Sequence, residues 1–245
     1  MKRTVFASLL IFMCMIVGCF ANHTNVNQDQ LTNAIQKRLY EQTGDKKVSQ
    51  ELTKFIMSNV LTWKVKSIDI SKANAILAFS FGNAYAKNGN QEPGKMNHEL
   101  ADLVVSIYNK THLPVYAQWE IAQSIGNRIP KKDLHTIYPK VDSQGNLVYL
   151  DTKGVAKEAI KEARGVNNLG TAVVVAFKEH ELRAVRTSQT LGIKAFAPKG
   201  YKLPDTYDKH SGQPWTRDKL TFMLYEIRTR ANIYRENLNG MISKK

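Results

Sequence analysis

Apolar residues recur at helical spacing through residues 30–64. Leu31, Ile35 and Leu39 stand four residues apart, and a second apolar set at 52–61 falls broadly on one helical face. A glycine and an aspartate separate the two sets, as expected for a break between helices. The pattern predicts an N-terminal helical hairpin that precedes the main domain.

From residue 65 to 245 the pattern changes to short apolar runs that alternate with amphipathic segments. The run 171–177 is continuously apolar and β-branched, which is typical of a central parallel strand covered on both faces. Strands are predicted at 75–79, 113–117, 134–138, 147–150, 171–177 and 193–197, and helices at 98–108, 120–125, 152–163, 179–191 and 216–238. Alternation of this kind predicts an α/β fold with a doubly wound, mostly parallel, Rossmann-like sheet and a long C-terminal helix.

The first 18 residues read as a secretory signal peptide. A positive start at Lys2-Arg3 precedes an uncharged apolar run from Val5 to Val17. That run of about 13 residues is shorter than the roughly 20 that a membrane-spanning helix needs. Gly18-Cys19 at its end resembles the bacterial lipobox, in which the cysteine is lipid-modified and the preceding peptide is removed.

The lipobox resemblance implies a lipoprotein carrying palmitate-type chains on Cys19, with residues 19–29 as a polar tether. Two acyl chains on one cysteine suffice for stable anchoring. The protein is then expected on the periplasmic side of the cell envelope. In enteric lipoproteins, an Asp directly after the lipidated cysteine resembles an inner-membrane retention signal. This chain has Phe20 at that position, which favours the outer membrane in a diderm. Ordinary cleavage after Ala21, giving a soluble exported protein, remains the alternative.

The composition shows a strongly basic chain with few cysteines. The chain carries 35 basic and 21 acidic residues, a formal net charge of +14. Such a balance draws an exported protein to anionic envelope surfaces. Nucleic acid is the usual partner of this charge, but an export signal argues against it. A solvated basic surface without a specific ligand is the competing interpretation.

Cys14 and Cys19 are the only cysteines, so cysteine-type zinc sites are excluded from the domain.

The segment 173–184, followed by Gly192-Ile193, resembles the late strand-loop-helix of the DUF218 family of YdcF/SanA/ElyC-like envelope proteins. The run 69–82 is similar to that family's opening strand and glycine-containing loop. Asp151-Thr152 stands where the family has a Thr-containing helix start, which implies a ligand-binding role for Thr152. The resemblance covers roughly residues 72–237. It implies a role in envelope integrity and in cell-wall precursor or lipid-carrier metabolism, and one relative is associated with S-adenosylmethionine binding.

His180 and Arg183 form the most specific part of that resemblance. They are one helical turn apart at a predicted helix N-terminus, so both can face one crevice. Free backbone N–H groups, the helix dipole and the guanidinium would hold an anion there. His180 is a candidate general acid/base. In the structural alternative, His180 packs or caps the helix and Arg183 pairs with Glu179.

Two other loops at the carboxyl ends of strands carry candidate residues, where α/β sheets bind ligands. Ser80, Gly82 and Asn83 are candidates for cradling a phosphate or sugar, and a plain turn is the alternative. Trp119 is a candidate for stacking on a ring, or else a core residue. Glu120 is a candidate catalytic base or hydroxyl acceptor, or else a first-turn charge that favours the helix dipole.

These observations predict an exported, membrane-anchored, YdcF/SanA-like α/β protein of the cell envelope that binds a phosphate- or nucleotide-bearing small molecule. A non-catalytic basic lipoprotein that binds an anionic envelope component is the alternative. No metal-ligand spacing, nucleophile elbow, Walker loop or full dinucleotide fingerprint is present. The sequence assigns no cofactor, and it leaves open whether a reaction is catalysed.

Overall fold

The computed structural model describes residues 27–144 and 147–242, which form two compact units that meet at Met57 and Ser58. The first unit contains the predicted hairpin as α2 (Gln28–Thr43) and α3 (Lys46–Phe55), and the π-helical turn η2 (Ile56–Val60) spans the boundary. Gly44 ends α2 in the left-handed conformation, at φ 65°, and the Asp45 side chain caps α3 by accepting the Val48 N–H. The glycine and aspartate therefore set the break between the two helices.

The second unit is built around a six-stranded sheet in which every neighbouring pair is parallel. Its order is β1-β10-β9-β2-β5-β6. The strands are β1 (Ser67–Ile68), β2 (Ala75–Ala78), β5 (Val115–Gln118), β6 (Leu134–Ile137), β9 (Thr171–Val175) and β10 (Lys194–Pro198). The α/β prediction is confirmed, and a parallel sheet is found where a mostly parallel one was expected.

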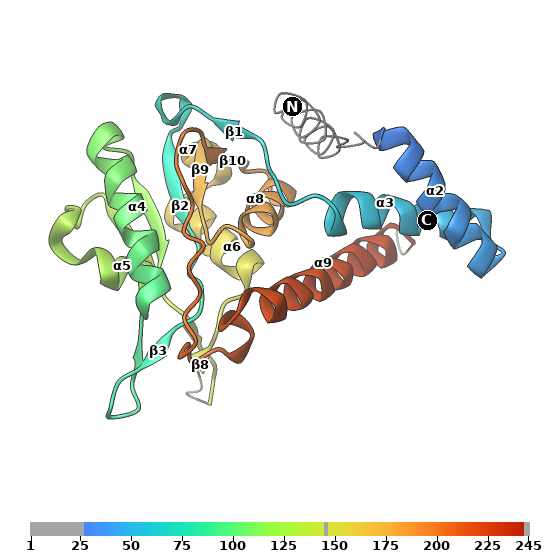
Figure 1. The fold of residues 1–245 in the computed structure, drawn as a ribbon. Helices are drawn as coiled ribbons and strands as arrows, with labels where there is room; N and C mark the ends of the chain where they lie inside the picture. The colour runs from blue at the N-terminus through green and yellow to red at the C-terminus, as the bar shows by residue number, and fades with distance from the viewer. Residues whose placement is uncertain (1–26, 145–146, 243–245) are drawn as a thin grey trace, which may run out of the picture. The chain divides into compact units, whose positions relative to one another are not determined.

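Helices cover both faces of this sheet (Figure 1). Ile76 and Val173 pack with α4 (Lys95–Thr111) and α5 (Trp119–Ile125), whereas Leu77 and Val174 pack with helices of the other layer. That layer consists of α6 (Thr152–Glu162), α7 (Val166–Leu169) and α8 (Glu181–Thr190). Successive strand residues therefore enter opposite apolar cores, which is why these strands have no polar face.

The direction of winding reverses between β2 and β9. From β2 the chain moves outward through β5 to β6, and it then returns to place β9 on the other side of β2 and moves on to β10. Ala78 is in register with Val175 of β9 and with Ala117 of β5, so the three strands end at one edge. The carboxyl ends of the strands that flank such a switch point are where open α/β sheets bind ligands.

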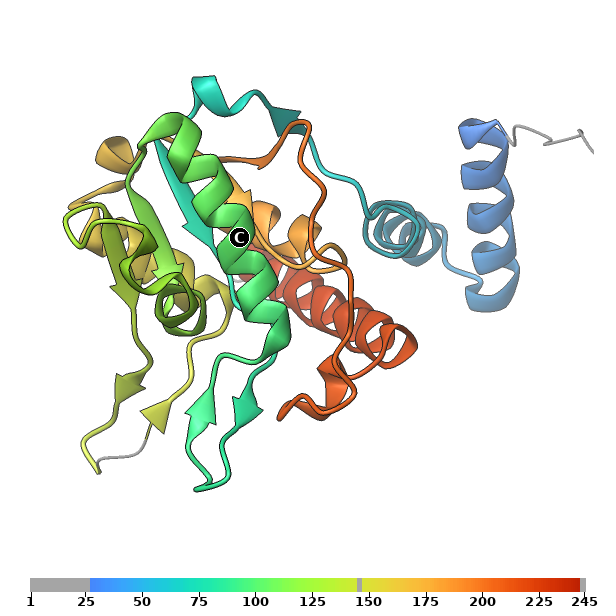
Figure 2. The same cartoon turned by 60° about the vertical axis from the view of Figure 1, so that its left-hand side comes forward.

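Two antiparallel hairpins extend past this edge (Figure 2): β3 (Ala84–Tyr85) with β4 (Gln91–Glu92), and β7 (Lys140–Val141) with β8 (Leu147–Val148). The extended stretch expected at 147–150 thus lies outside the main sheet, while the edge strand β1 was not foreseen, because two residues carry no periodicity.

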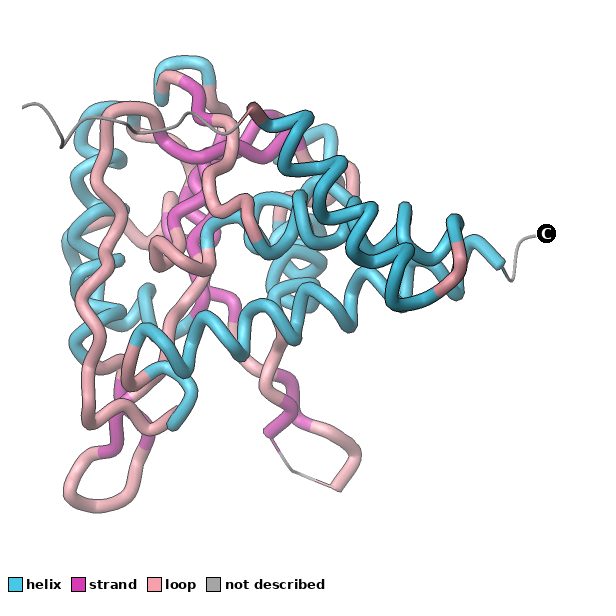
Figure 3. The backbone as a smooth tube through the Cα atoms, turned by 45° about the vertical axis from the view of Figure 1, so that its right-hand side comes forward, coloured by secondary structure: helices cyan, strands magenta, loops and turns pink. Residues whose placement is uncertain are grey.

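A loop without regular structure leads from β10 to the C-terminal helix (Figure 3). It passes through the short turn η5 (Pro214–Thr216) into α9 (Lys219–Ile242), the predicted long helix. The other short turns are η3 (Ile70–Lys72) and η4 (Gly126–Arg128). None of the described helices is both long and apolar enough to span a bilayer.

Candidate functional site

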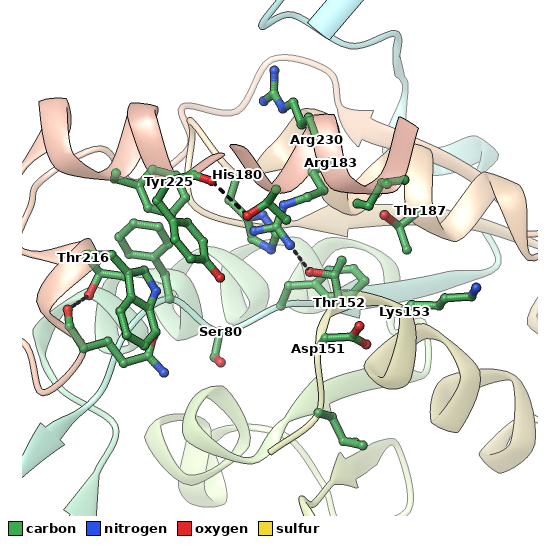
Figure 4. A pocket seen from close by; sticks show the side chains of 18 of the residues that line it. Ser80, Asp151, Thr152, Lys153, His180, Arg183, Thr187, Thr216, Tyr225 and Arg230 are labelled. Carbon is green, nitrogen blue, oxygen red and sulfur yellow. Dashed lines mark hydrogen bonds between the residues drawn. The ribbon is translucent and has the colours of Figure 1, made fainter. Parts of the chain in front are cut away.

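A cavity of about 1040 Å³ opens at the carboxyl ends of β2 and β9, within the second unit (Figure 4). Its walls come from the loop 79–83 after β2, the segment 149–153 at the start of α6, the N-terminal part of α8, η5 and α9. The topology alone places a binding site here, and the cavity coincides with it.

The predicted site residues divide into two groups. Those that line the cavity are Ser80, Gly82, Asn83, Thr152, His180 and Arg183. Trp119 and Glu120, at the start of α5, are not among its lining residues, although Glu120 contacts the wall through Tyr149. Cys19, the predicted lipidation site, lies outside the described residues.

Side chains of Asn97 and Gln118 fix the loop after β2 through hydrogen bonds. The buried Asn97 side chain accepts the Phe81 N–H at 2.8 Å and donates to the Gly82 carbonyl at 2.9 Å, and Gln118 Oε1 accepts the Ser80 N–H at 3.1 Å. These two backbone donors are therefore not free to cradle an anion. Gly82 has φ +65°, and a Cβ there would lie 2.6 Å from Ser211 Oγ, so glycine is required for packing and conformation.

Arg183 joins the N-terminal ends of two helices. Its Nη1 donates to Thr152 Oγ1 at 2.5 Å, at the start of α6, and its Nε donates to Glu226 of α9 at 2.8 Å (Figure 4). The Arg183–Glu179 pair considered from sequence is not formed, because Glu179 bonds to Lys219 instead. Within the described residues, neither of these two bonds uses Arg183 Nη2, and Arg183 lines the cavity.

His180 is the N-cap residue of α8 and is 5% exposed. Its Nδ1 is buried and has no hydrogen-bond partner within the described chain. Burial, with Arg183 and Arg230 nearby, holds the pKa of His180 well below its ordinary value. His180 is therefore neutral at physiological pH and presents to the cavity wall an imidazole with one N–H donor and one acceptor.

Two further arginines make this wall positive. Arg186 donates to the Ser58 carbonyl at 2.8 Å, and Arg230 donates to Glu226 at 3.0 Å while its guanidinium stacks 4.1 Å from the Trp63 ring centroid. Both arginines line the cavity. The sequence analysis did not select them, although Arg186 follows Arg183 at a spacing of three on one helix, a signal that was available.

Lys153 completes the basic wall. It lies in the first turn of α6, exposed to solvent and among the cavity-lining residues. Lys153 adds positive charge at this helix N-terminus, while the Asp151 carboxylate, which also lines the cavity, already accepts the Gly154 N–H at 2.7 Å.

The opposite part of the cavity is aromatic. Trp215 and Tyr225 stack with ring centroids 5.4 Å apart and an interplanar angle of 17°, and both line the cavity. Figure 4 places Tyr225 and Thr216 on one side and Thr152 and Lys153 on the other. The site therefore offers an aromatic surface and a positive surface at opposite ends.

A chain of hydroxyl and carboxyl groups lies beneath Ser80. Tyr149 Oη is 3.2 Å from Ser80 Oγ and donates to Glu120 Oε1 at 2.6 Å, and Gln118 Nε2 donates to Tyr149 Oη at 3.2 Å. Sequence reasoning missed Tyr149 and Gln118, because nothing in the local pattern signals a contact between residues 31 positions apart.

Comparison of the chain with protein-family models, curated proteins and solved structures finds no match. Within the described residues, no group of three or more His, Cys, Asp or Glu side chains is placed to hold a metal ion. The geometry of the cavity is therefore the basis for assigning function.

Proposed function

We propose that this chain is an exported, lipid-anchored α/β protein of the cell envelope whose cavity binds a phosphate-bearing small molecule with a planar ring, as in a nucleotide. One observation carries the binding proposal: a single cavity at the β2–β9 switch point joins a positive wall to an aromatic wall. The envelope role and the similarity to the DUF218 family remain predictions from sequence.

The positive wall suits a phosphate group. Arg183 and Lys153 offer charge, and the N-terminal ends of α6 and α8 add their dipoles. Arg183 is already oriented by Thr152 and Glu226, so its remaining donor is fixed before a ligand arrives. A preorganised guanidinium binds phosphate with little further loss of conformational freedom.

The aromatic wall suits a ring. Trp215 lines the cavity and is 37% exposed although its ring stacks on Tyr225, so part of the indole is accessible to a ligand. Base–aromatic stacking contributes about 1–3 kcal/mol per base. A ligand that reaches both walls would be a phosphate ester of a ring-bearing molecule, whereas free phosphate would use only one wall.

Titration calorimetry on the full chain in detergent tests the binding proposal. Nucleoside 5′-monophosphates should bind more tightly than the matching nucleosides or inorganic phosphate. Trp215→Ala should weaken monophosphate binding at least about tenfold, because it removes about 1.4 kcal/mol or more of stacking, and it should leave phosphate binding unchanged. Tyr138→Ala, an exposed aromatic outside the cavity, is the matched control. Equal effects of the two variants would contradict the proposal.

Anchoring through Cys19 has its own test. Cys19→Ser should abolish incorporation of radiolabelled palmitate and move the protein from the membrane fraction to the soluble fraction or leave it as an uncleaved precursor, because no acyl chains hold it. Mass spectrometry of the wild type should find a lipid-modified N-terminal cysteine. A mature wild-type N-terminus at Asn22 would refute the anchor and support the alternative cleavage after Ala21.

A further inference from the structure

We propose that Ser80 is the nucleophile of a phosphoester-cleaving relay in which Tyr149 and Glu120 take up its proton. The inference rests on the proposed function for the presence of a phosphate-bearing ligand in the cavity. It adds a reaction, and it assigns Tyr149, which the sequence analysis did not select.

The three groups stand in the order that an activated nucleophile requires. Ser80 Oγ lies 3.2 Å from Tyr149 Oη, which lies 2.6 Å from Glu120 Oε1. A nucleophile within hydrogen-bond reach of a proton acceptor, itself oriented by a third group, is the general arrangement for nucleophilic catalysis by a hydroxyl. Ser80 lines the cavity directly after β2, at the switch point of the sheet.

Counting donors gives the relay a direction. Tyr149 has one hydroxyl proton, and an ionised Glu120 can only accept, so that proton points to Glu120. Gln118 Nε2 donates to Tyr149 Oη at 3.2 Å. Ser80 must then donate to Tyr149 as well, which directs the Ser80 lone pairs away from the relay and toward the cavity. Gln118 also accepts the Ser80 N–H, so one side chain positions both hydroxyls.

Glu120 is suited to receive a proton. Its carboxyl group is buried, and Oε2 has no hydrogen-bond partner within the described chain. Burial raises the pKa of Glu120, and the hydrogen bond from Tyr149 offsets part of that rise. A desolvated carboxylate is a stronger base than an exposed one, provided that the pH lies above its pKa.

The same cavity supplies the charge that phosphoryl transfer needs. Figure 4 places Ser80 across the opening from Thr152 and Arg183. Arg183 lines the cavity and can hold non-bridging phosphate oxygens while Ser80 attacks, whereas Lys153 points away from Ser80 and adds only longer-range positive charge. Positioning and electrostatic stabilisation provide most of the catalysis in phosphoryl transfer.

The reaction proceeds in two balanced steps. Ser80 Oγ forms a bond to phosphorus as the bond to the leaving oxygen breaks, the Ser80 proton passes to Tyr149, and the Tyr149 proton passes to Glu120. The leaving oxygen takes a proton from solvent. Water then displaces Ser80 from phosphorus and releases one proton to solvent, which balances the proton taken by the leaving oxygen, and Glu120 returns its proton through Tyr149 to Ser80 Oγ. The net reaction is hydrolysis of a phosphoester to an alcohol and phosphate.

A short-chain alkyl fluorophosphonate tests the relay without knowledge of the ligand. The expected result on the full chain in detergent is one adduct, formed with loss of fluoride and located at Ser80 by tandem mass spectrometry. Ser80→Ala should abolish it. Tyr149→Phe and Glu120→Gln should each slow its formation about 100-fold, which is within the range for loss of general-base assistance.

Matched controls separate the relay from folding. Tyr138→Phe changes an exposed tyrosine outside the cavity, and Glu236→Gln changes an exposed residue that is not part of the Ser80–Tyr149–Glu120 relay, so both variants should label at the wild-type rate. The Gln side chain at position 120 can still accept from Tyr149, so thermal unfolding near the wild-type midpoint should show an intact fold.

Two results would overturn the inference: folded wild-type protein without an adduct at Ser80, or labelling of Tyr149→Phe and Glu120→Gln within about twofold of wild type. The proposed function fails separately. If monophosphates bind but Ser80 is not labelled, only the relay is wrong. If Ser80 is labelled through the relay but no monophosphate binds, the assigned ligand class is wrong.

Discussion

Replacing Glu226 with Gln is expected to lower the free energy of unfolding by about 3–5 kcal/mol, the usual cost of removing one partner from a buried ion pair. Glu226 is fully buried and bonds to two arginines, to Arg183 Nε at 2.8 Å and to Arg230 Nε at 3.0 Å. Its carboxylate is the acidic partner that these two guanidinium groups share. Without it, two buried positive charges face a neutral amide.

Thermal unfolding of the second unit measures this loss. For a domain of this size, 1 kcal/mol shifts the midpoint by roughly 2–4 °C, so a decrease on the order of 10 °C is expected. Glu236→Gln, on the exposed part of the same helix, should change stability by no more than about 0.5 kcal/mol. Similar midpoints for the two variants would show that the Arg183–Glu226–Arg230 cluster does not hold α9 against α8.

Glu181→Gln is expected to stabilise the protein increasingly as pH rises. The Glu181 carboxyl group, in the first turn of α8, is buried with neither oxygen hydrogen-bonded within the described chain. Burial raises its pKa well above 4.5, and the nearby Ala176 N–H offsets only part of that rise. The folded state therefore keeps a proton that the unfolded state releases, and the wild type loses about 1.4 kcal/mol per pH unit above pH 4.5 until pH reaches the raised pKa.

Chemical unfolding of the wild type and the Glu181→Gln variant between pH 4 and pH 8 checks the sign of this effect. The two proteins should have similar stability near pH 4, where Glu181 is protonated in both states. Above pH 4.5 the variant should become the more stable, and Glu236→Gln should not. A constant difference across this range would mean that Glu181 ionises normally in the folded protein.

The architecture could be predicted from sequence because a parallel sheet covered on both faces requires continuous apolar strands. The run 171–177 and the alternation of strands with helices therefore identified the main elements of the sheet, except β1. The strand order was not predicted, because it depends on which strands pair after the chain returns from β6.

The site was predicted only in part. Loop position and residue chemistry selected Ser80, and the family resemblance selected His180 and Arg183; all three line one cavity. Trp119 also follows a strand at its carboxyl end, yet it does not line the cavity. Position after a strand predicts which edge of the sheet a residue is near, but not the direction of its side chain. Tyr149 reaches the site through a long-range contact, which a single sequence does not encode locally.

Lys153 provides the most direct measurement of the central claim that the basic wall binds the phosphate. Lys153 lines the cavity, whereas Lys157, one turn later on the same helix, is exposed and outside it. Titration of a nucleoside monophosphate should show that Lys153→Gln weakens binding about tenfold, corresponding to about 1.4 kcal/mol, and that Lys157→Gln does not. Equal losses in the two variants would instead indicate general attraction of anions to a basic surface and would contradict a phosphate site at this wall.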